Sequence, residues 1–288
     1  MTFLVDKDTK ILIQGITGTQ ASFHARRSLE YGSNIVCGVT PGKGGSEHLG
    51  VPVFNTVKEA MQKTHPEASV LFVPGSAVKS AVEESVEAGI KLLICVSANV
   101  PVNDMLTINK ILAANNAKMI GPNTPGLIVP NQTRLGIFPE NIHQQGHIGV
   151  VSRSSTLTYE AVLEVNRSGL GQSAVVGLGD DLVIGMNFVE ALQLFHQDKN
   201  TSAIVMIGEM GGSFEEEGAE WYKNYAAKKP IICYIAGDDT TFSKTMGYAN
   251  DIITKGHISF KQKKEKLKKS GIIVVDKINQ IHQELSRL

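Results

Sequence analysis

The chain has 288 residues, of which 28 are basic and 28 are acidic, so its formal net charge is zero. This length predicts about two domains, and a neutral chain lacks a global electrostatic reason to bind nucleic acid or an anionic membrane. No apolar run approaches the roughly 18 residues that a membrane-spanning helix needs, so no such helix is predicted.

The N-terminus and the cysteines favour a cytoplasmic location. Asp6 and Asp8 interrupt the stretch where a signal peptide would have its basic and apolar regions. The three cysteines lie in apolar runs and form no C-x-x-C pair. They are therefore predicted to be buried strand residues in a reducing compartment, and no metal site is predicted.

Short apolar runs alternate with helix-like segments through the first 120 residues. Strands are predicted at 11–14, 35–39, 51–54, 69–73, 92–96 and 118–120, and helices at 22–31, 57–63, 78–88 and 104–115. This alternation is typical of βαβ units with a parallel sheet. The pattern stops between 121 and 147, a stretch containing Pro122, Pro125, Pro130 and Pro139. Residues 123–147 are therefore predicted to connect two domains.

The alternation resumes at residue 148 and predicts a second α/β domain. Strands are predicted at 148–151, 173–176, 203–207, 230–235 and 271–275, and helices at 158–167, 188–196 and 215–227. The predicted domains are therefore residues 1–122 and 148–288. The basic run 261–269 is predicted to be the solvent-exposed face of an amphipathic helix.

A turn containing two glycines, residues 15–21, follows the first predicted strand and opens a helix. Free N–H groups at a helix start attract anions. The spacing G-x-x-G-x-x-A departs from the dinucleotide fingerprint, and a loop with Lys43 replaces the acidic residue expected after the second strand. A lysine there suits an adenosine ligand that carries an extra phosphate, so coenzyme A fits better than NAD. A plain tight turn is the alternative interpretation.

Two further turns, 152–156 and 208–213, follow predicted strands in the second half. The hydroxyl groups of the first turn could cap a helix or bind an anion. Ser213 precedes Glu215, Glu216 and Glu217, a pattern that suits helix capping and the helix dipole. Each turn alone fits either interpretation, but two of them in one domain favour a shared anion between them.

These motifs are colinear with those of a known family. The matching segments are residues 14–18, 38–45, 52–57, 121–123, 152–154 with 156–160, and 207–209 with 211–213. Nearly end to end, the chain resembles the alpha subunits of succinate–CoA ligases, which belong to the nucleoside-diphosphate-forming acyl-CoA synthetases. The resemblance implies an N-terminal Rossmann-like CoA-binding domain followed by a flavodoxin-like ligase domain, both with mainly parallel sheets.

The resemblance also implies roles for individual residues. Coenzyme A would be bound by Thr17, Gly18, Thr19, Gln20, Lys43, Val96, Ser97 and Ala98. Tyr159 would lie near the carboxylate substrate. The turns with Ser154, Ser155, Gly211 and Gly212 would hold the phosphate of a phosphohistidine, and Glu209 would orient that histidine.

A partner is implied as well. In the family, an ATP-grasp beta subunit supplies the Mg-nucleotide site, so a hetero-oligomer is expected. The family reaction converts succinate, CoA and a nucleoside triphosphate into succinyl-CoA, nucleoside diphosphate and phosphate, within the tricarboxylic acid cycle. A histidine of the alpha subunit carries the phosphoryl group between steps, which divides one difficult transfer into easier ones.

The chain departs from the family at this histidine. Tyr248 stands where the family's Met-Gly-His-Ala pattern has its histidine. Imidazole has a pKa of about 6.5 and is a competent nucleophile at pH 7, whereas a phenol with a pKa of about 10 stays protonated. Asp180 adds a negative charge in a Gly-Gly-Asp-Pro segment of the family, which disfavours an anion. Ala98 replaces a glutamate of the family.

Because the changes cluster on the phosphohistidine while the turns with Gly15 and Lys43 are intact, we predict that CoA binding is retained and the phosphoryl relay is impaired. A catalytically silent CoA-binding or regulatory paralogue is one alternative. An acyl transferase that uses no phosphohistidine is another. His257, nine positions after Tyr248, is a candidate displaced nucleophile.

Overall fold

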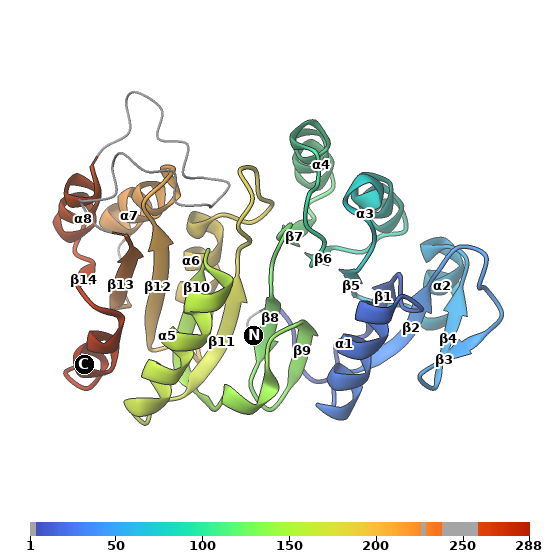
Figure 1. The fold of residues 1–288 in the computed structure, drawn as a ribbon, viewed down its shortest axis with the longest axis horizontal. Helices are drawn as coiled ribbons and strands as arrows, with labels where there is room; N and C mark the ends of the chain where they lie inside the picture. The colour runs from blue at the N-terminus through green and yellow to red at the C-terminus, as the bar shows by residue number, and fades with distance from the viewer. Residues whose placement is uncertain (1–3, 226–228, 238–258) are drawn as a thin grey trace. The chain divides into compact units, whose positions relative to one another are not determined.

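The computed structural model describes residues 4–225, 229–237 and 259–288. The chain divides into two compact units. The first comprises Val5–Glu140 and Val183–Met186, and the second comprises Met1–Leu4, Asn141–Leu182 and Asn187–Leu288. Each unit has a mainly parallel sheet with helices packed on it (Figure 1), which confirms the predicted α/β class.

The sheet of the first unit reverses its strand order at β1. Its order is β3 (Glu47–His48), β4 (Val51–Phe54), β2 (Ile35–Val39), β1 (Ile11–Gln14), β5 (Ala68–Leu71), β6 (Leu92–Cys95) and β7 (Lys118–Ile120). All neighbours are parallel except β3, which is antiparallel to β4. Strands β2 and β4 follow on one side of β1, and strands β5, β6 and β7 follow on the other side. A crevice is expected where the strand order reverses in this way.

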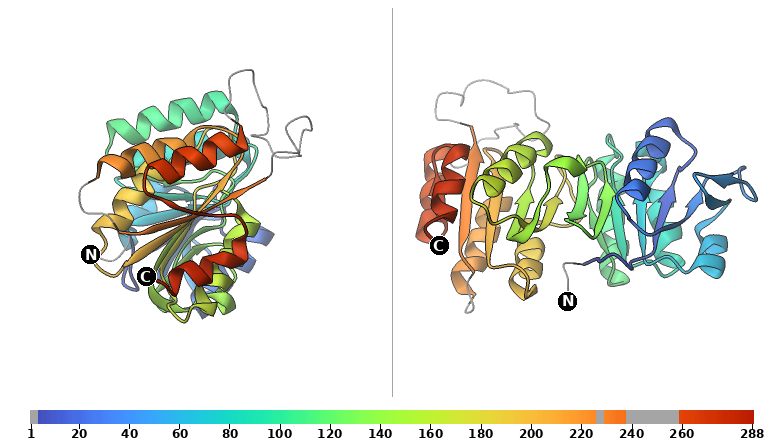
Figure 2. Two further views of the ribbon diagram at one scale, coloured as in Figure 1. Left: turned by 90° about the vertical axis from the view of Figure 1, so that its left-hand side faces the viewer. Right: turned by 90° about the horizontal axis from the view of Figure 1, so that it is seen from below.

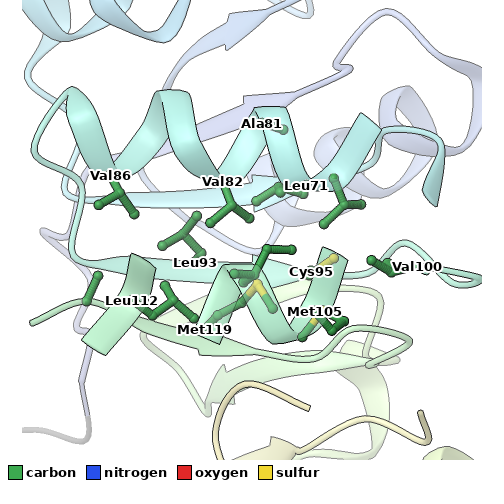
Figure 3. Packing of buried hydrophobic residues seen from close by; sticks show 13 residues of the cluster. Leu71, Ala81, Val82, Val86, Leu93, Cys95, Val100, Met105, Leu112 and Met119 are labelled. Atoms are coloured by element: carbon green, nitrogen blue, oxygen red, sulfur yellow. The ribbon is translucent and has the colours of Figure 1, made fainter. Parts of the chain in front are cut away.

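Four helices cover this sheet: α1 (Thr19–Glu30), α2 (Val57–Thr64), α3 (Val78–Glu87) and α4 (Val102–Ala114). Helices α3 and α4 pack on β5, β6 and β7 through a buried cluster that includes Val82, Leu93, Met105 and Met119 (Figure 3). The central strands β1, β5 and β6 are buried along their whole length, as parallel strands between helices are. This explains why continuous apolar runs located them in the sequence.

Among its described residues, the second unit contains five parallel strands in the order β14 (Ile273–Val275), β13 (Ile231–Ala236), β12 (Ala203–Glu209), β10 (Gln145–Ser152) and β11 (Gln172–Gly177). Its helices are α5 (Ser155–Arg167), α6 (Phe188–Gln197), α7 (Phe214–Asn224), α8 (Phe260–Lys269) and α9 (Ile281–Leu285). Helix α5 packs against α9 and α7 against α8, and the two pairs cover opposite faces of the sheet (Figure 2).

Residues 123–147 contain regular structure that the sequence did not predict. Strands β8 (Gly126–Val129) and β9 (Thr133–Gly136) form an antiparallel hairpin, and β10 begins at Gln145. The two strands approach so closely that a Cβ atom on Gly126 would lie 2.0 Å from the Leu135 carbonyl oxygen. Glycines and prolines in and around these strands interrupt the apolar alternation by which strands are predicted.

One short segment belongs to the first unit although, in sequence, it lies between two stretches of the second unit. In Val183–Met186, the Gly185 N–H donates to the Gly121 carbonyl at 2.9 Å and the Met186 N–H donates to the Met119 carbonyl at 2.7 Å. The side-chain amide of Asn109 on α4 donates to the Ile184 carbonyl at 3.0 Å. The segment therefore lies against β7, which is one of the two edge strands of that sheet.

Two sequence predictions concern the burial of the cysteines and the lack of a membrane-spanning helix. Cys37, Cys95 and Cys233 are buried in β2, β6 and β13, as predicted. Burial raises the pKa of the Cys37 thiol to about 11. Among the helices of the described residues, none has the length and apolar character needed to cross a membrane.

Candidate functional site

A cavity of about 470 Å³ opens in the first unit where the strand order reverses. Three turns line it, each following the last residue of a strand: 15–18 after β1, 40–41 after β2 and 72–74 after β5. Ala77, Ser80, Ala81 and Glu84, at the start of α3 and along it, complete the lining. Ligands of open α/β sheets bind in this kind of crevice, outside the carboxyl ends of the strands.

The turn after β1 needs glycine for two reasons. Gly15 has a φ of +78°, and a Cβ atom on it would lie 2.7 Å from the Phe72 carbonyl oxygen. The Gly18 N–H donates to the Gly15 carbonyl at 2.9 Å, and Gly18 is the N-cap residue of α1. The turn therefore brings the positive end of a helix dipole to a wall of the cavity, which favours an anion there.

Gln14, at the end of β1, is a buried polar residue of the cavity wall. Its side-chain amide nitrogen donates to the hydroxyl of Ser85 at 2.7 Å and of Ser69 at 3.0 Å, and lies 3.3 Å from the Ala81 carbonyl. These contacts fix the orientation of the amide and connect β1 to α3 across the sheet. No role was predicted for Gln14 beyond its place in the motif at residues 14–18.

The structure brings some of the predicted CoA residues to the cavity and not others. Thr17 and Gly18 line it, and the Thr17 hydroxyl lies 3.3 Å from the Thr40 hydroxyl across the opening. Thr19 and Gln20 are exposed in the first turn of α1, which begins at Thr19 rather than at the predicted residue 22. Lys43 is exposed on the loop after β2 and is not part of the lining.

The predicted segment Val96, Ser97 and Ala98 lies behind the cavity wall. The Ser97 hydroxyl donates to the Val73 carbonyl at 2.5 Å, and Val73 lines the cavity. A Cβ atom on Gly75 would lie 2.6 Å from the Ala98 carbonyl oxygen. The segment therefore supports the turn after β5 and does not itself line the cavity.

Lining residues in the turn after β5 and on α3 were missed by sequence reasoning. Phe72, Val73 and Pro74 directly follow β5, so the rule that strand ends meet at one edge could have found them. Ser80 and Glu84 line the cavity from α3, and no local pattern in the sequence marks them.

In the second unit, Ser154 caps α5. Its hydroxyl accepts the Leu157 N–H at 3.4 Å, and its carbonyl accepts the hydroxyl protons of Thr158 at 2.5 Å and Ser152 at 2.8 Å. Helix α5 begins at Ser155, and Tyr159 is half-buried in its second turn. The capping interpretation of this turn is therefore confirmed for Ser154.

A buried guanidinium connects the turns that were predicted to share an anion. The Arg153 side chain is 1% exposed, and its guanidinium lies 4.5 Å from the centre of the Phe214 ring. It donates to the Asp181 carbonyl at 2.9 Å, and its Nη1 atom lies 3.9 Å from the position of a Cβ on Gly212. The turns before α5 and α7 and the 179–181 segment thus meet around one positive charge.

A second buried cation, Lys263 of α8, organises the turn that follows Glu209. Its ammonium donates to the Glu209 carbonyl at 2.8 Å and lies 3.3 Å from the Gly211 carbonyl. It also lies 2.6 Å from a carboxylate oxygen of Glu215 and 3.3 Å from one of Glu216. Burial raises the pKa of Glu216, and the charge of Lys263 opposes that rise.

These contacts correct two sequence predictions. Lys263 is 1% exposed, so the run 261–269 is not a uniformly solvated face. Ser213 does not cap α7 with its side chain. Its hydroxyl instead donates to the Glu217 carboxylate at 2.7 Å. Tyr248 and His257 lie outside the described residues.

Two family comparisons match the two units. Residues 6–99 match the CoA binding domain family, and residues 151–282 match the CoA-ligase family. Solved structures share the fold at low identity. One is ATP citrate lyase from Methanothrix soehngenii in complex with citrate and coenzyme A, with a TM-score of 0.88 and 18% identity. The match covers 99% of this chain and 50% of that chain, so this chain spans half of its length.

Curated relatives are much more similar in sequence. The ADP-forming succinate–CoA ligase subunit alpha of Aquifex aeolicus is 45% identical over 290 residues, covering 100% of this chain and 95% of that protein. The corresponding subunit of Staphylococcus aureus strain N315 is 44% identical over 272 residues, covering 94% and 90%. With both matched domains in the family's order, the chain belongs to the family of succinate–CoA ligase alpha subunits.

Proposed function

We propose that this chain is the CoA-binding alpha subunit of a succinate–CoA ligase type complex whose phosphoryl relay is impaired. The cavity at the reversal of the first sheet carries this proposal, because it lies within the residues that match CoA binding domains. Its volume of about 470 Å³ suits part of a cofactor of this size. The free N–H groups at the start of α1 favour the binding of phosphate groups there.

In this proposal the phosphates of coenzyme A contact the exposed residues Thr19, Gln20 and Lys43. Thr17 and Gly18 form the wall beside them, and Val96, Ser97 and Ala98 hold the neighbouring turn. Ser154, Ser155, Gly211 and Gly212 form the anion site of the ligase unit, with Glu209 and Tyr159 beside it. The division by function into residues 1–122 and 148–288, with 123–147 between them, stays a prediction.

Replacing Lys43 with alanine is expected to weaken CoA binding about tenfold, because one charge-assisted phosphate contact is lost. Isothermal titration of the purified chain with CoA measures this. Lys110→Ala is the matched control, since Lys110 is an exposed lysine on α4. Equal affinities for Lys43→Ala and the unmodified chain would remove Lys43 from the site.

The nucleotide chemistry is proposed to come from a partner. An ATP-grasp beta subunit would bind the Mg-nucleotide and assemble with this chain into a cytoplasmic hetero-oligomer. The proposed impairment rests on Tyr248, since a phenol is a poor phosphoryl carrier at neutral pH.

A Tyr248→His variant tests the impairment. With a succinate–CoA ligase beta subunit, succinate, CoA and ATP, we expect thioester from the variant and none above background from the unmodified chain. Thioester from the unmodified chain would contradict the proposal and make His257→Ala the next variant. Thioester from neither chain would favour the alternative of a catalytically silent CoA-binding paralogue.

A further inference from the structure

We propose that Asn55 is a positioning residue for coenzyme A, which holds the loop of Lys43 so that its ammonium meets the ribose phosphate of the ligand. Asn55 follows β4 and does not line the cavity. The inference rests on the proposed CoA-binding function and adds a residue to it. Residues 40–46 are called the Lys43 loop below.

One side-chain oxygen of Asn55 holds the loop on both sides of Lys43. The N–H groups of Gly42 and Gly44 donate to the Asn55 Oδ1 atom at 2.9 and 3.0 Å. A Cβ atom on Gly44 would lie 2.3 Å from the Asn55 Nδ2 atom. The backbone of the loop therefore rests directly on the Asn55 amide, with the Lys43 side chain exposed.

Asn55 is itself fixed by the start of α2. Its N–H donates to the Glu59 carboxylate at 3.1 Å, and the neighbouring Thr56 hydroxyl caps α2 by accepting the Glu59 N–H at 3.1 Å. Within the loop, the Lys43 N–H donates to the Thr40 carbonyl at 3.0 Å. The conformation of the loop is thus determined by a helix terminus that stands outside the cavity.

A second contact ties the chain just beyond the loop to the glycine turn. The His48 ring nitrogen Nε2 lies 2.7 Å from the Ser22 hydroxyl on α1. That hydroxyl donates to the Ile16 carbonyl at 2.9 Å, so His48 is the donor to it. With Asn55 on one side and Ser22 on the other, the spacing between Lys43 and the turn at residues 15–18 is set before any ligand binds. Such preorganisation reduces the entropy lost on binding.

The position of the loop identifies the ligand group that Lys43 meets. In nucleotide-binding α/β sheets, the residues after the second strand contact the adenosine ribose, and a cation there accommodates a ribose phosphate. Within residues 4–225, 229–237 and 259–288, the Lys43 ammonium has no hydrogen-bond or ion-pair partner. Its charge is therefore available to a phosphate on the ribose. Asn55 determines the position of this charge, because it holds the backbone of the Lys43 loop.

A double-mutant cycle with two ligands tests the proposal. Lys43→Ala, Asn55→Ala and the double variant are titrated with CoA and with 3′-dephospho-CoA, and thermal unfolding checks each fold. We expect each single variant to bind CoA about tenfold more weakly, and the double variant to bind it no more than about twofold more weakly still. Affinity for 3′-dephospho-CoA is expected to stay the same in all of them. Asn115→Ala, at the exposed end of α4, is the matched control.

The outcomes separate the inference from the proposed function. Absence of CoA binding by the unmodified chain would overturn the proposed function and the inference together. CoA binding with fully additive losses would leave the function standing and overturn the role of Asn55. An equal loss of both ligands in Asn55→Ala would also overturn it, since general damage to the loop would explain that result.

Discussion

The free energy of unfolding of a Lys263→Met variant is expected to be about 3–5 kcal/mol lower than that of the unmodified chain. The Lys263 side chain is 1% exposed and Glu215 is fully buried, with 2.6 Å between the ammonium nitrogen and a carboxylate oxygen. Removing the cation leaves two buried acids without compensation and removes a donor from the Glu209 carbonyl. Urea unfolding followed by fluorescence of Trp221, the single tryptophan and a residue of α7, reports on this unit.

The comparison variants make this result specific. Lys266→Met changes an exposed lysine of the same helix and is expected to shift stability by less than about 0.5 kcal/mol. Adding Glu215→Gln and Glu216→Gln to Lys263→Met is expected to restore part of the loss, because the unpaired charges are then absent. Similar small effects from Lys263→Met and Lys266→Met would contradict the role assigned to the buried cation.

The loss in Lys263→Met is also expected to shrink as the pH falls. Burial raises the pKa of Glu216, and Lys263 opposes that rise, so the pKa increases further once the cation is removed. A carboxyl group with a raised folded-state pKa binds more protons in the folded state than in the unfolded state. Its unfavourable contribution is therefore relieved on acidification through that pKa.

The second large effect is expected at Gly15. Gly15→Ala should weaken CoA binding at least about a hundredfold, because an alanine must adopt a left-handed conformation and its Cβ would stand 2.7 Å from the Phe72 carbonyl oxygen. Either the turn after β1 or the turn after β5 then has to move, and both turns line the cavity. Titration with CoA and thermal unfolding measure the two consequences separately.

Gly32→Ala separates the backbone effect from the clash. Gly32 also has a positive φ, +94°, but a Cβ there would meet nothing within 4 Å. This variant is expected to lose about 1–2 kcal/mol of stability through strain alone and to bind CoA like the unmodified chain. If Gly15→Ala bound CoA with unchanged affinity, the turn after β1 would not be the ligand site.

The sequence located the strands well because most of them are buried on both faces. The predicted bounds of β1, β2, β4 and β7 agree with the structure, since an apolar run between helices has little choice of conformation. The hairpin of β8 and β9 was missed because its glycines serve the close approach of two backbones, and that approach depends on the partner strand. Apolar alternation does not record such a requirement.

The candidate site was predictable only where it is local in the chain. The turn with Gly15 and Gly18 directly follows one strand and precedes one helix, so its motif could be recognised from neighbouring residues in the sequence. Lys263 was grouped with its lysine neighbours because a charge run favours solvent. Lys263 and Leu267 are nevertheless one helical turn apart and both buried. That spacing was the available signal, and its meaning depended on acids from α7 that only folding brings close.

The segment Val183–Met186 has a consequence for how the chain folds during synthesis. Domains emerging from a ribosome generally fold from the N-terminus onward. Here the backbone partners of Met119 and Gly121 lie about 65 residues later in the chain. Until they emerge, the nascent first unit has β7 with an uncovered edge, the kind of surface that pairs with other strands. The first unit therefore completes its sheet only after β10, α5 and β11 of the second have been made.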